Sequence, residues 1–167
     1  MGTLLVTVVY GKEGKARLEV LDCIFPFDSS ASILEQPYGG LLLLETRLAA
    51  NEAAMRLAGC STSLIFKIIP IDAIVESDLG RISSEVLRLV PQDASGVAVD
   101  CIRRGRSLPS SSYVEEEVGR LLKGRGNAID LENPALVVRI DIIGDRSTIS
   151  VRPPSGFISK RGGTADG

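Results

Sequence analysis

The sequence predicts a mixed α/β protein with two consecutive sheet-and-helix domains, and three observations lead to this expectation. Hydrophobic residues make up 44% of the 167-residue chain and aromatic residues only 4%, so the cores must be packed from aliphatic side chains. Segments with alternating apolar residues are interspersed with segments whose apolar residues recur at helical spacing, as strands and helices require. Turns rich in Gly and Pro separate the segments.

The first half of the chain begins with a strand, a helix and a hairpin. Thr3–Tyr10 alternates and is rich in β-branched residues, which is typical of a strand. Lys12–Phe25 has apolar residues at helical spacing and ends at a proline. The apolar runs Ala31–Gln36 and Leu41–Leu48 flank the sequence Pro-Tyr-Gly-Gly, which favours a tight turn between two strands.

A second helix and a fourth strand complete this half. Ala50–Ala58 places its alanines on one helical face, and Gly59 is a suitable cap. Leu64–Ile71 is a strongly apolar strand. The order strand, helix, strand, strand, helix, strand predicts a ferredoxin-like split βαββαβ domain over residues 1–76.

A second α/β domain is predicted over residues 77–155. Asp78 can cap a helix with an apolar stripe from Leu79 to Leu89. A strand over Val97–Arg103 and a polar loop follow. Ser112 then has capping-box spacing with Glu115 at the start of another helix.

The second domain ends with two strands. Leu136–Ile143 is the longer strand, and a Gly-Asp turn connects it to a strand over Ser147–Val151. We expect residues 156–167 to form a flexible tail. Gly119 lies inside the helix that begins near Ser112, where glycine costs roughly 1 kcal/mol relative to alanine. We expect close packing of that helix against the sheet to offset the cost, and direct contact with a ligand is the alternative.

Composition argues against an enzyme. The chain contains no histidine, which removes the commonest general base and most zinc sites. Cys23, Cys60 and Cys101 show no pairing pattern, so we expect three small buried hydrophobic residues. The acidic run Glu115–Glu117 is explained by the helix dipole. The glycine-rich phosphate-binding motifs GxGxxG and GxxxxGK(S/T) are both absent from the sequence. We therefore expect no catalytic residue, no metal and no cofactor.

The apolar runs also argue against a membrane protein. Gly39–Leu44 and Leu64–Ile71 are far shorter than the roughly 20 residues that a membrane helix needs. The start, Met1–Tyr10, has no basic leader and has the pattern of a strand rather than of a signal peptide. We expect a cytoplasmic protein.

Charge is distributed unevenly along the chain. The net charge is −2, yet residues 1–100 carry 8 Lys and Arg against 13 Asp and Glu, whereas residues 101–167 carry 11 against 8. A local cationic patch can bind phosphate whatever the total charge. The strongest candidate is the strand end Cys101–Arg106, whose three arginines lead into the serine-rich start of a helix with free backbone amides.

From this pattern we predict phosphate contacts by Arg103, Arg104 and Arg106, with other basic and hydroxyl side chains around them. A solvated basic strand end is the alternative for this segment taken alone. The full set of residues predicted to contact a phosphate-bearing ligand such as a nucleic acid is Arg103, Arg104, Arg106, Ser107, Ser110, Ser111, Ser112, Lys123, Arg125, Arg139, Arg146 and Arg152.

Taken together, these segments resemble the THUMP domain. The basic strand end precedes a Ser-capped helix with Val118-Gly119, and Ile129–Ala135 is similar to the family's vdl-x-nPd motif. The strand Val137–Ile142 corresponds to the family's next element. The resemblance covers roughly residues 79–152, and Ala135 departs from it because an acidic residue is common there.

The resemblance implies a function in tRNA modification. THUMP domains occur in tRNA thiouridine synthetases, methyltransferases, pseudouridine synthases and tRNA acetylation adaptors, and with a ferredoxin-like domain they hold the acceptor stem and 3′ end of tRNA. Enzymes of this kind carry a separate catalytic domain, for which this chain has no room. The resemblance therefore implies a stand-alone, non-catalytic adaptor that presents tRNA to an RNA cytidine acetyltransferase forming N4-acetylcytidine.

Other hypotheses remain open at this stage. The chain could be the substrate-binding component of a split tRNA thiolation or methylation enzyme. It could also be a protein-interaction or assembly module that pairs through an exposed sheet edge of the acidic first half. A small stand-alone enzyme is the third, and it would need an Asp or Cys site that the sequence does not reveal.

Overall fold

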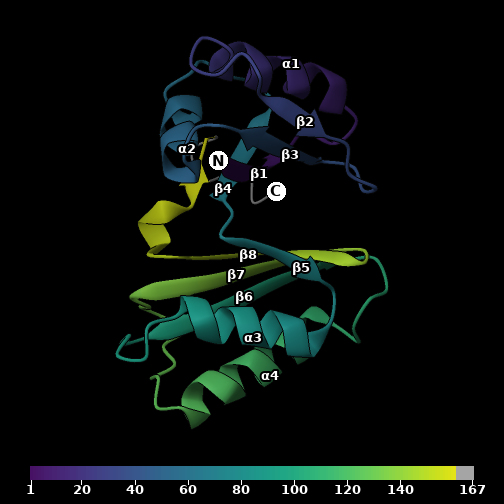
Figure 1. The fold of residues 1–167 in the computed structure, drawn as a ribbon. Coiled ribbons are helices and arrows are strands. Elements are labelled where there is room, and N and C mark those ends of the chain that lie inside the picture. Colours follow the sequence, from purple (N-terminus) through teal and green to yellow (C-terminus); the bar gives the residue numbers. More distant parts are fainter. Residues whose placement is uncertain (161–167) are drawn as a thin grey trace. The chain divides into compact units, whose positions relative to one another are not determined.

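The computed structural model describes residues 1–160. It contains two sheets, and two helices pack on each of them (Figure 1). Residues 1–71 and the described residues from Gly156 onward form a first compact unit, and Asp72–Ser155 form a second. The predicted mixed α/β fold class is confirmed. Within residues 1–160, no helix has the length and apolar character of a membrane-spanning segment.

The first unit has the predicted ferredoxin-like order. Its elements are β1 (Gly2–Val8), α1 (Glu13–Ile24), β2 (Ser32–Leu34), β3 (Leu41–Thr46), α2 (Ala50–Ala58), β4 (Ile65–Pro70) and β9 (Ile158–Ser159). The strand order is β2-β3-β1-β4-β9, and every neighbouring pair is antiparallel. The first four strands and two helices therefore form the split βαββαβ arrangement.

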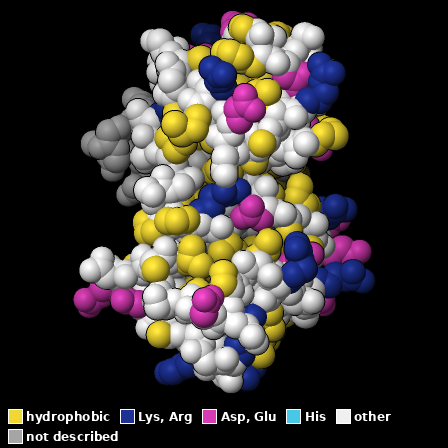
Figure 2. Space-filling model, turned by 60° about the vertical axis from the view of Figure 1, so that its left-hand side comes forward, with side chains coloured by type: hydrophobic (Ala, Val, Ile, Leu, Met, Phe, Trp, Pro, Cys, Tyr) yellow, Lys and Arg dark blue, Asp and Glu magenta, His cyan; other side chains and the backbone are white. Residues whose placement is uncertain are grey.

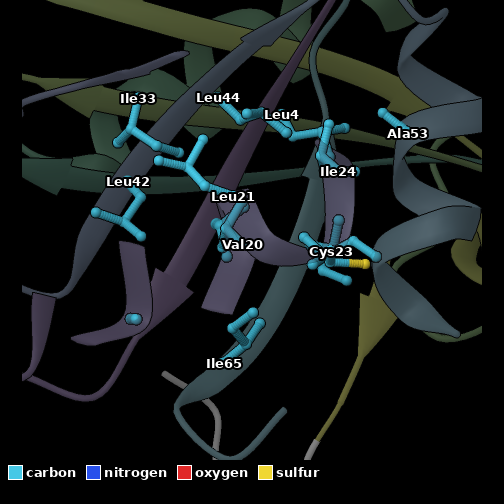
Figure 3. Close-up of a cluster of buried hydrophobic side chains, with 14 of the residues drawn as sticks. Leu4, Val20, Leu21, Cys23, Ile24, Ile33, Leu42, Leu44, Ala53 and Ile65 are labelled. Carbon is cyan, nitrogen blue, oxygen red and sulfur yellow. The ribbon is translucent and has the colours of Figure 1, made fainter. Parts of the chain in front are cut away.

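An aliphatic core joins the helices of the first unit to its sheet. Leu4 from β1 and Ile24 from α1 are fully buried, and Ala53 from α2 lies against the same cluster (Figure 3). Leu44 and Ile65 bring β3 and β4 into this cluster. The core therefore has the aliphatic character that the composition predicts.

The end of the described chain belongs to the first unit. Ile158 and Ser159 pair with β4, and the Lys160 ammonium donates to the carbonyls of Ala58 and Cys60 at 3.0 and 2.6 Å, where a cation suits the helix dipole. The expected flexible tail is therefore wrong for residues 156–160. Residues 161–167 lie outside the described residues.

The second unit contains a sheet with one parallel pair. Its elements are β5 (Ala73–Glu76), α3 (Leu79–Leu89), β6 (Val97–Arg104), α4 (Ser111–Gly124), β7 (Leu136–Ile143) and β8 (Arg146–Arg152), followed by a short 3₁₀ turn (Pro154–Gly156). The strand order is β5-β8-β7-β6, with β6 parallel to β7 and the other pairs antiparallel. Helices α3 and α4 cover the same face of this sheet (Figure 1).

Strand β5 belongs to the second unit, so the boundary between the units differs from the predicted one. The sequence pattern predicts that its residues belong to the first domain, but they pair with β8 in the second sheet, from Ala73 opposite Ile149 to Glu76 opposite Arg146. The division between the units accordingly falls after Ile71 rather than after residue 76. The four residues of β5 are too few to show a clear alternation in the sequence.

The cysteines correct another expectation. Cys23 at the end of α1 and Cys60 after α2 form a disulfide with a Cα–Cα distance of 6.2 Å. Only Cys101 fits the interpretation of a free buried cysteine. Burial and the nearby Glu115 carboxylate raise its pKa to about 12, so this thiol stays protonated. The pairing was missed because residues 37 apart give no local spacing signal.

Asp28 fixes the connection between α1 and β2. Its carboxylate is buried and accepts hydrogen bonds from the Ser30 hydroxyl at 2.6 Å and the Thr46 hydroxyl at 2.7 Å. The backbone amide of Arg47 donates to it at 2.7 Å. The two hydroxyl donors, followed by this amide, hold the pKa of Asp28 well below its usual range.

Reduction should destabilise the first unit. The disulfide joins residues 37 apart, and closing a loop of that size in the unfolded chain stabilises by about 3 to 4 kcal/mol. Urea unfolding of the Cys23→Ser/Cys60→Ser variant, and of wild type in reductant, should show matching losses. Identical unfolding midpoints with and without reductant would contradict the pairing, as would more than one reactive thiol in the unfolded, unreduced protein.

Acid should weaken the protein through Asp28. Because its folded-state pKa lies below its unfolded-state value of about 3.9, the carboxylate stabilises the fold above about pH 4, and this contribution is lost as the pH falls. Asp28→Asn should be less stable than wild type at neutral pH and should lose less stability between about pH 5 and pH 2. Urea midpoints across this range measure the difference, and parallel curves for the two proteins would refute it.

Candidate nucleic-acid interface

One edge of the second sheet collects strand ends and helix starts. Arg104 at the end of β6 is level with Ile143 at the end of β7, which pairs with Arg146 at the start of β8, and Arg146 pairs with Glu76. Helix α3 follows the end of β5 and α4 follows the end of β6, so both helices begin here. We call this region, residues 76–81, 103–112 and 143–146, the strand-end edge.

Helix α4 begins with unpaired backbone donors at this edge. The cap is Ser110, whose hydroxyl accepts from the Tyr113 amide at 3.0 Å. The predicted cap at Ser112 is therefore wrong, because the helix starts one residue before it. Ser111 and Ser112 lie in the first turn, where amides have no partner within the helix.

Glu115 has a different role from the predicted capping box. With Ser110 as the cap, Tyr113 occupies the third helical position. A tyrosine has no carboxylate to accept a hydrogen bond from the cap amide, so the capping box cannot form. The Glu115 carboxylate instead accepts from the Cys101 amide of β6 at 2.8 Å. This bond ties the first turns of α4 to the strand that precedes it.

The loop between β6 and α4 is held in place. Gly105 has φ +98°, and Leu108 has φ +66°, a left-handed conformation that is unusual for a residue with a side chain. The Leu108 side chain packs against the core of the second unit, which can offset the strain. The Arg104 carbonyl accepts from the Gly144 amide at 2.9 Å, so the loop starts from a fixed point on the sheet.

Three arginines at the strand-end edge are open to a ligand. Arg106 and Arg146 are exposed, and neither forms an ion pair within residues 1–160. Arg103 donates to the carbonyl of Gly105 at 2.7 Å, which leaves its other donors available. Ser107 lines one shallow hollow together with Arg146.

Other predicted contacts belong to a buried ion network. Asp141 is fully buried in β7 and accepts from Arg139 at 2.8 and 3.0 Å and from Arg104 at 3.0 Å. Burial opposes the charge on Arg139, but the Asp141 carboxylate outweighs it and raises the pKa of the guanidinium. Arg139 therefore supports the sheet, and Arg104 reaches the edge with part of its guanidinium already bound.

The remaining predicted cations lie at the opposite edge of the second sheet. Arg125 donates to the Leu87 carbonyl at 2.7 Å and to Asn127 at 2.8 Å, so it caps the end of α3. Arg152 pairs with Asp72 at 2.8 Å. Lys123 is exposed near the end of α4. These three side chains are not brought together with the strand-end edge.

The predicted set is thus divided by the fold. The residues that meet at the strand-end edge are Arg103, Arg104, Arg106, Ser107, Ser110, Ser111, Ser112 and Arg146. Arg81 in the first turn of α3 also lies there, 3.8 Å from Glu76, and was not predicted. The spacing of Arg139 and Asp141, two residues apart on one strand face, was a signal that could have identified the structural arginine.

The second unit as a whole does not carry an excess of positive charge. Residues 72–155 contain 11 Lys and Arg and 13 Asp and Glu, so the positive balance of residues 101–167 reflects where the sequence was divided. On the face shown in Figure 2, charges of both signs are interspersed. Any phosphate site must therefore be a local arrangement such as the strand-end edge.

Comparison with known proteins matches this unit to a family. Residues 76–152 match the THUMP domain family. A tRNA sulfurtransferase from Desulfurococcus amylolyticus is 28% identical over 108 residues, which cover 64% of this chain and 21% of the relative. The chain therefore spans about a fifth of that relative's length.

Solved structures share the fold of nearly the whole chain. PH1313 from Pyrococcus horikoshii superposes with a TM-score of 0.74 at 17% identity, covering 95% of this chain and 55% of that one. TrmN from Thermus thermophilus gives 0.65 at 25% identity, covering 92% and 47%. A 4-thiouridine synthetase in complex with RNA and ATP gives 0.61 at 13% identity, covering 95% and 42%.

The family match covers the second unit from the last residue of β5 to the last residue of β8. Residues 76–152 of this chain form a THUMP domain.

Proposed function

We propose that this protein binds tRNA at the strand-end edge of its THUMP domain and presents it to a separate modification enzyme. The observation that carries the proposal is that Arg103, Arg106 and Arg146 lie on the strand ends and the loop of the edge at which α4 begins. The names of the similar proteins support it, since they include a tRNA sulfurtransferase and a 4-thiouridine synthetase bound to RNA.

The strand-end edge suits an RNA backbone. Guanidinium groups form paired hydrogen bonds with phosphate oxygens, and the amides of Ser111 and Ser112 add the donors and partial positive charge of a helix start. The hydroxyl of Ser107 can donate to a further phosphate oxygen. Glu76, Asp78 and Asp145 at the same edge limit the number of phosphates that fit, which favours a defined position over general adhesion.

The ligand we propose is the acceptor stem and 3′ end of tRNA, as the THUMP resemblance implies. We assign no catalytic residue or cofactor to this chain. An adaptor that holds both tRNA and enzyme raises the effective concentration of substrate at the active site and fixes its orientation. Such a role places the protein in the cytoplasm, where tRNA is modified.

Two chemistries are candidates for the partner enzyme. The resemblance to stand-alone THUMP adaptors favours an RNA cytidine acetyltransferase that forms N4-acetylcytidine. The sulfurtransferase relative favours a second candidate, in which this chain is the substrate-binding component of a tRNA thiolation enzyme. The similarity to TrmN makes methylation a variant of that second candidate.

Binding to tRNA should weaken with salt in a way that depends on the strand-end edge. Each phosphate contact contributes roughly 0.7 to 0.9 to the slope of log affinity against log salt. Arg103→Ala/Arg106→Ala should therefore reduce the slope by about 1.4 to 1.8. Fluorescence anisotropy with labelled tRNA at several salt concentrations measures it.

The matched control removes two exposed cations elsewhere on the same unit. Arg120→Ala/Lys123→Ala changes the net charge equally but lies away from the strand-end edge, so its slope should equal that of wild type. Equal slope changes in the two double variants would show that only overall charge matters, and the proposed site would be wrong.

The modification chemistry should be visible in cellular tRNA. In cells lacking this protein, nucleoside mass spectrometry should show loss of N4-acetylcytidine, and re-expression of wild type should restore it. Loss of 4-thiouridine or of a methylated nucleoside instead would establish the second candidate. If every modified nucleoside keeps its wild-type level, the protein has no required role in tRNA modification.

A further inference from the structure

Strand β6 leaves one side of the second sheet open. It is the last strand in the order β5-β8-β7-β6. The Val97 amide donates outward to the Ala128 carbonyl at 2.8 Å, and its carbonyl accepts from the Asp130 amide at 3.1 Å. Because the backbone direction alternates along a strand, Val99 and Cys101 turn their backbone groups toward the same open side.

The open positions on this edge are few and defined. The Cys101 amide is covered by the Glu115 carboxylate at 2.8 Å. The amide and carbonyl of Val99 have no hydrogen-bond partner within residues 1–160. One residue of an added antiparallel strand can exchange two hydrogen bonds with Val99 alone. These hydrogen bonds alone permit either direction, because Ala128 and Asp130 already bond both backbone groups of Val97 in the parallel sense.

A groove lies directly beside this edge, between β6 and α4. We call it the β6–α4 groove. Its lining includes Val99, Glu115, Gly119, Lys123, Ile129 and Leu131. Leu131 is 75% exposed although it is a large apolar residue. The groove thus offers apolar contact next to unpaired backbone groups, which is the arrangement by which sheet edges take up extended peptides.

Gly119 gives the groove its depth. A Cβ placed on Gly119 would meet no atom within 4 Å, so this glycine does not allow the close helix-sheet packing expected from the sequence. Glycine inside a helix costs roughly 1 kcal/mol relative to alanine, and no packing contact offsets it. The missing side chain instead leaves room for one from a ligand.

The two ends of the groove carry charged residues of opposite sign. Helix α4 runs antiparallel to β6, because Glu115 lies beside Cys101 while the chain after α4 returns to Val97. Glu115 and Glu116 therefore flank the Cys101 end, and Arg120 and Lys123 flank the Val97 end. An antiparallel segment with a basic residue before its apolar centre and an acidic residue after it would match both ends.

We propose that the β6–α4 groove binds an extended peptide segment of the partner protein by adding it as an antiparallel strand to β6. The segment carries an apolar side chain over Gly119, a basic residue on its N-terminal side and an acidic residue on its C-terminal side. This inference rests on the proposed adaptor role, since it supplies the contact by which the enzyme would be held while tRNA occupies the strand-end edge.

Gly119→Leu fills the groove without endangering the fold. Leucine favours helices over glycine by up to about 1 kcal/mol, and the space above Gly119 is open. Gly124→Leu is the matched control, because Gly124 ends the same helix, also has open space above it and does not line the groove. Any difference between the two variants therefore reports the groove.

The probe is a phage-displayed library of short random peptides, selected on the full chain. Selected peptides should share the basic–apolar–acidic order, bind Gly119→Leu at least about tenfold more weakly than wild type, and bind Gly124→Leu equally well. Bound peptide should slow hydrogen exchange at the Val99 amide. Selection of no peptide, or of peptides that bind both variants equally, would overturn the proposal.

Anisotropy with tRNA separates this inference from the proposed function. Both glycine variants should bind tRNA as wild type does. If Gly119→Leu loses tRNA affinity while no peptide is selected, the groove is an RNA contact and the peptide proposal is wrong. If wild type fails to bind tRNA but peptides still depend on Gly119, the groove stands and the tRNA role falls.

Discussion

The parallel pairing of β6 with β7 is the constraint on which both candidate sites depend. Parallel neighbours cannot be joined by a tight turn and need a crossover, here the loop and helix α4 between Arg104 and Leu136. The crossover makes α4 begin where β6 ends, which puts helix amides beside the arginines of the strand-end edge. It also lays α4 alongside the outer edge of β6, which creates the β6–α4 groove. One pairing therefore separates the proposed polar site for phosphate from the proposed apolar site for peptide.

The buried ion network explains why so few of the unit's arginines are free. Asp141 is surrounded by Arg104 and Arg139 on the sheet face opposite α3 and α4, and removing it would leave uncompensated buried charge. Arg125 and Arg152 are likewise bound to carbonyls and to Asp72. Basic residues thus hold the second sheet and its helices in place. Of the cations predicted to bind, Arg103, Arg106 and Arg146 remain available at the strand-end edge, and Lys123 is exposed at the far end of α4. This division, rather than an excess of positive charge, defines the candidate site.

Much of the fold follows from local pattern, and the deviations have physical causes. The strands over Leu41–Thr46 and Leu136–Ile143 and the helix capped by Asp78 agree with expectation because their apolar periodicity and caps are local. The Cys23–Cys60 bond and strand β5 were missed because each depends on partners distant in sequence. Among three consecutive serines, core packing of α4 selects Ser110 as the cap, which spacing to a glutamate cannot reveal. The arginine pattern led to the proposed strand-end edge but could not indicate which guanidiniums are already bound, since that requires knowing which carboxylates share their sheet face.

Hydrogen exchange of the backbone amides, with and without tRNA, is the measurement that tests where the RNA lies. Unbound, the first-turn amides of α4 exchange readily because they have no helical partner. Bound tRNA should slow exchange at Ser111 and Ser112 and in the loop from Gly105, while Val99 and the end of α4 remain unchanged. Protection confined to the opposite edge of the sheet, around Lys123 and Arg125, with none at the start of α4, would contradict the assignment of the strand-end edge.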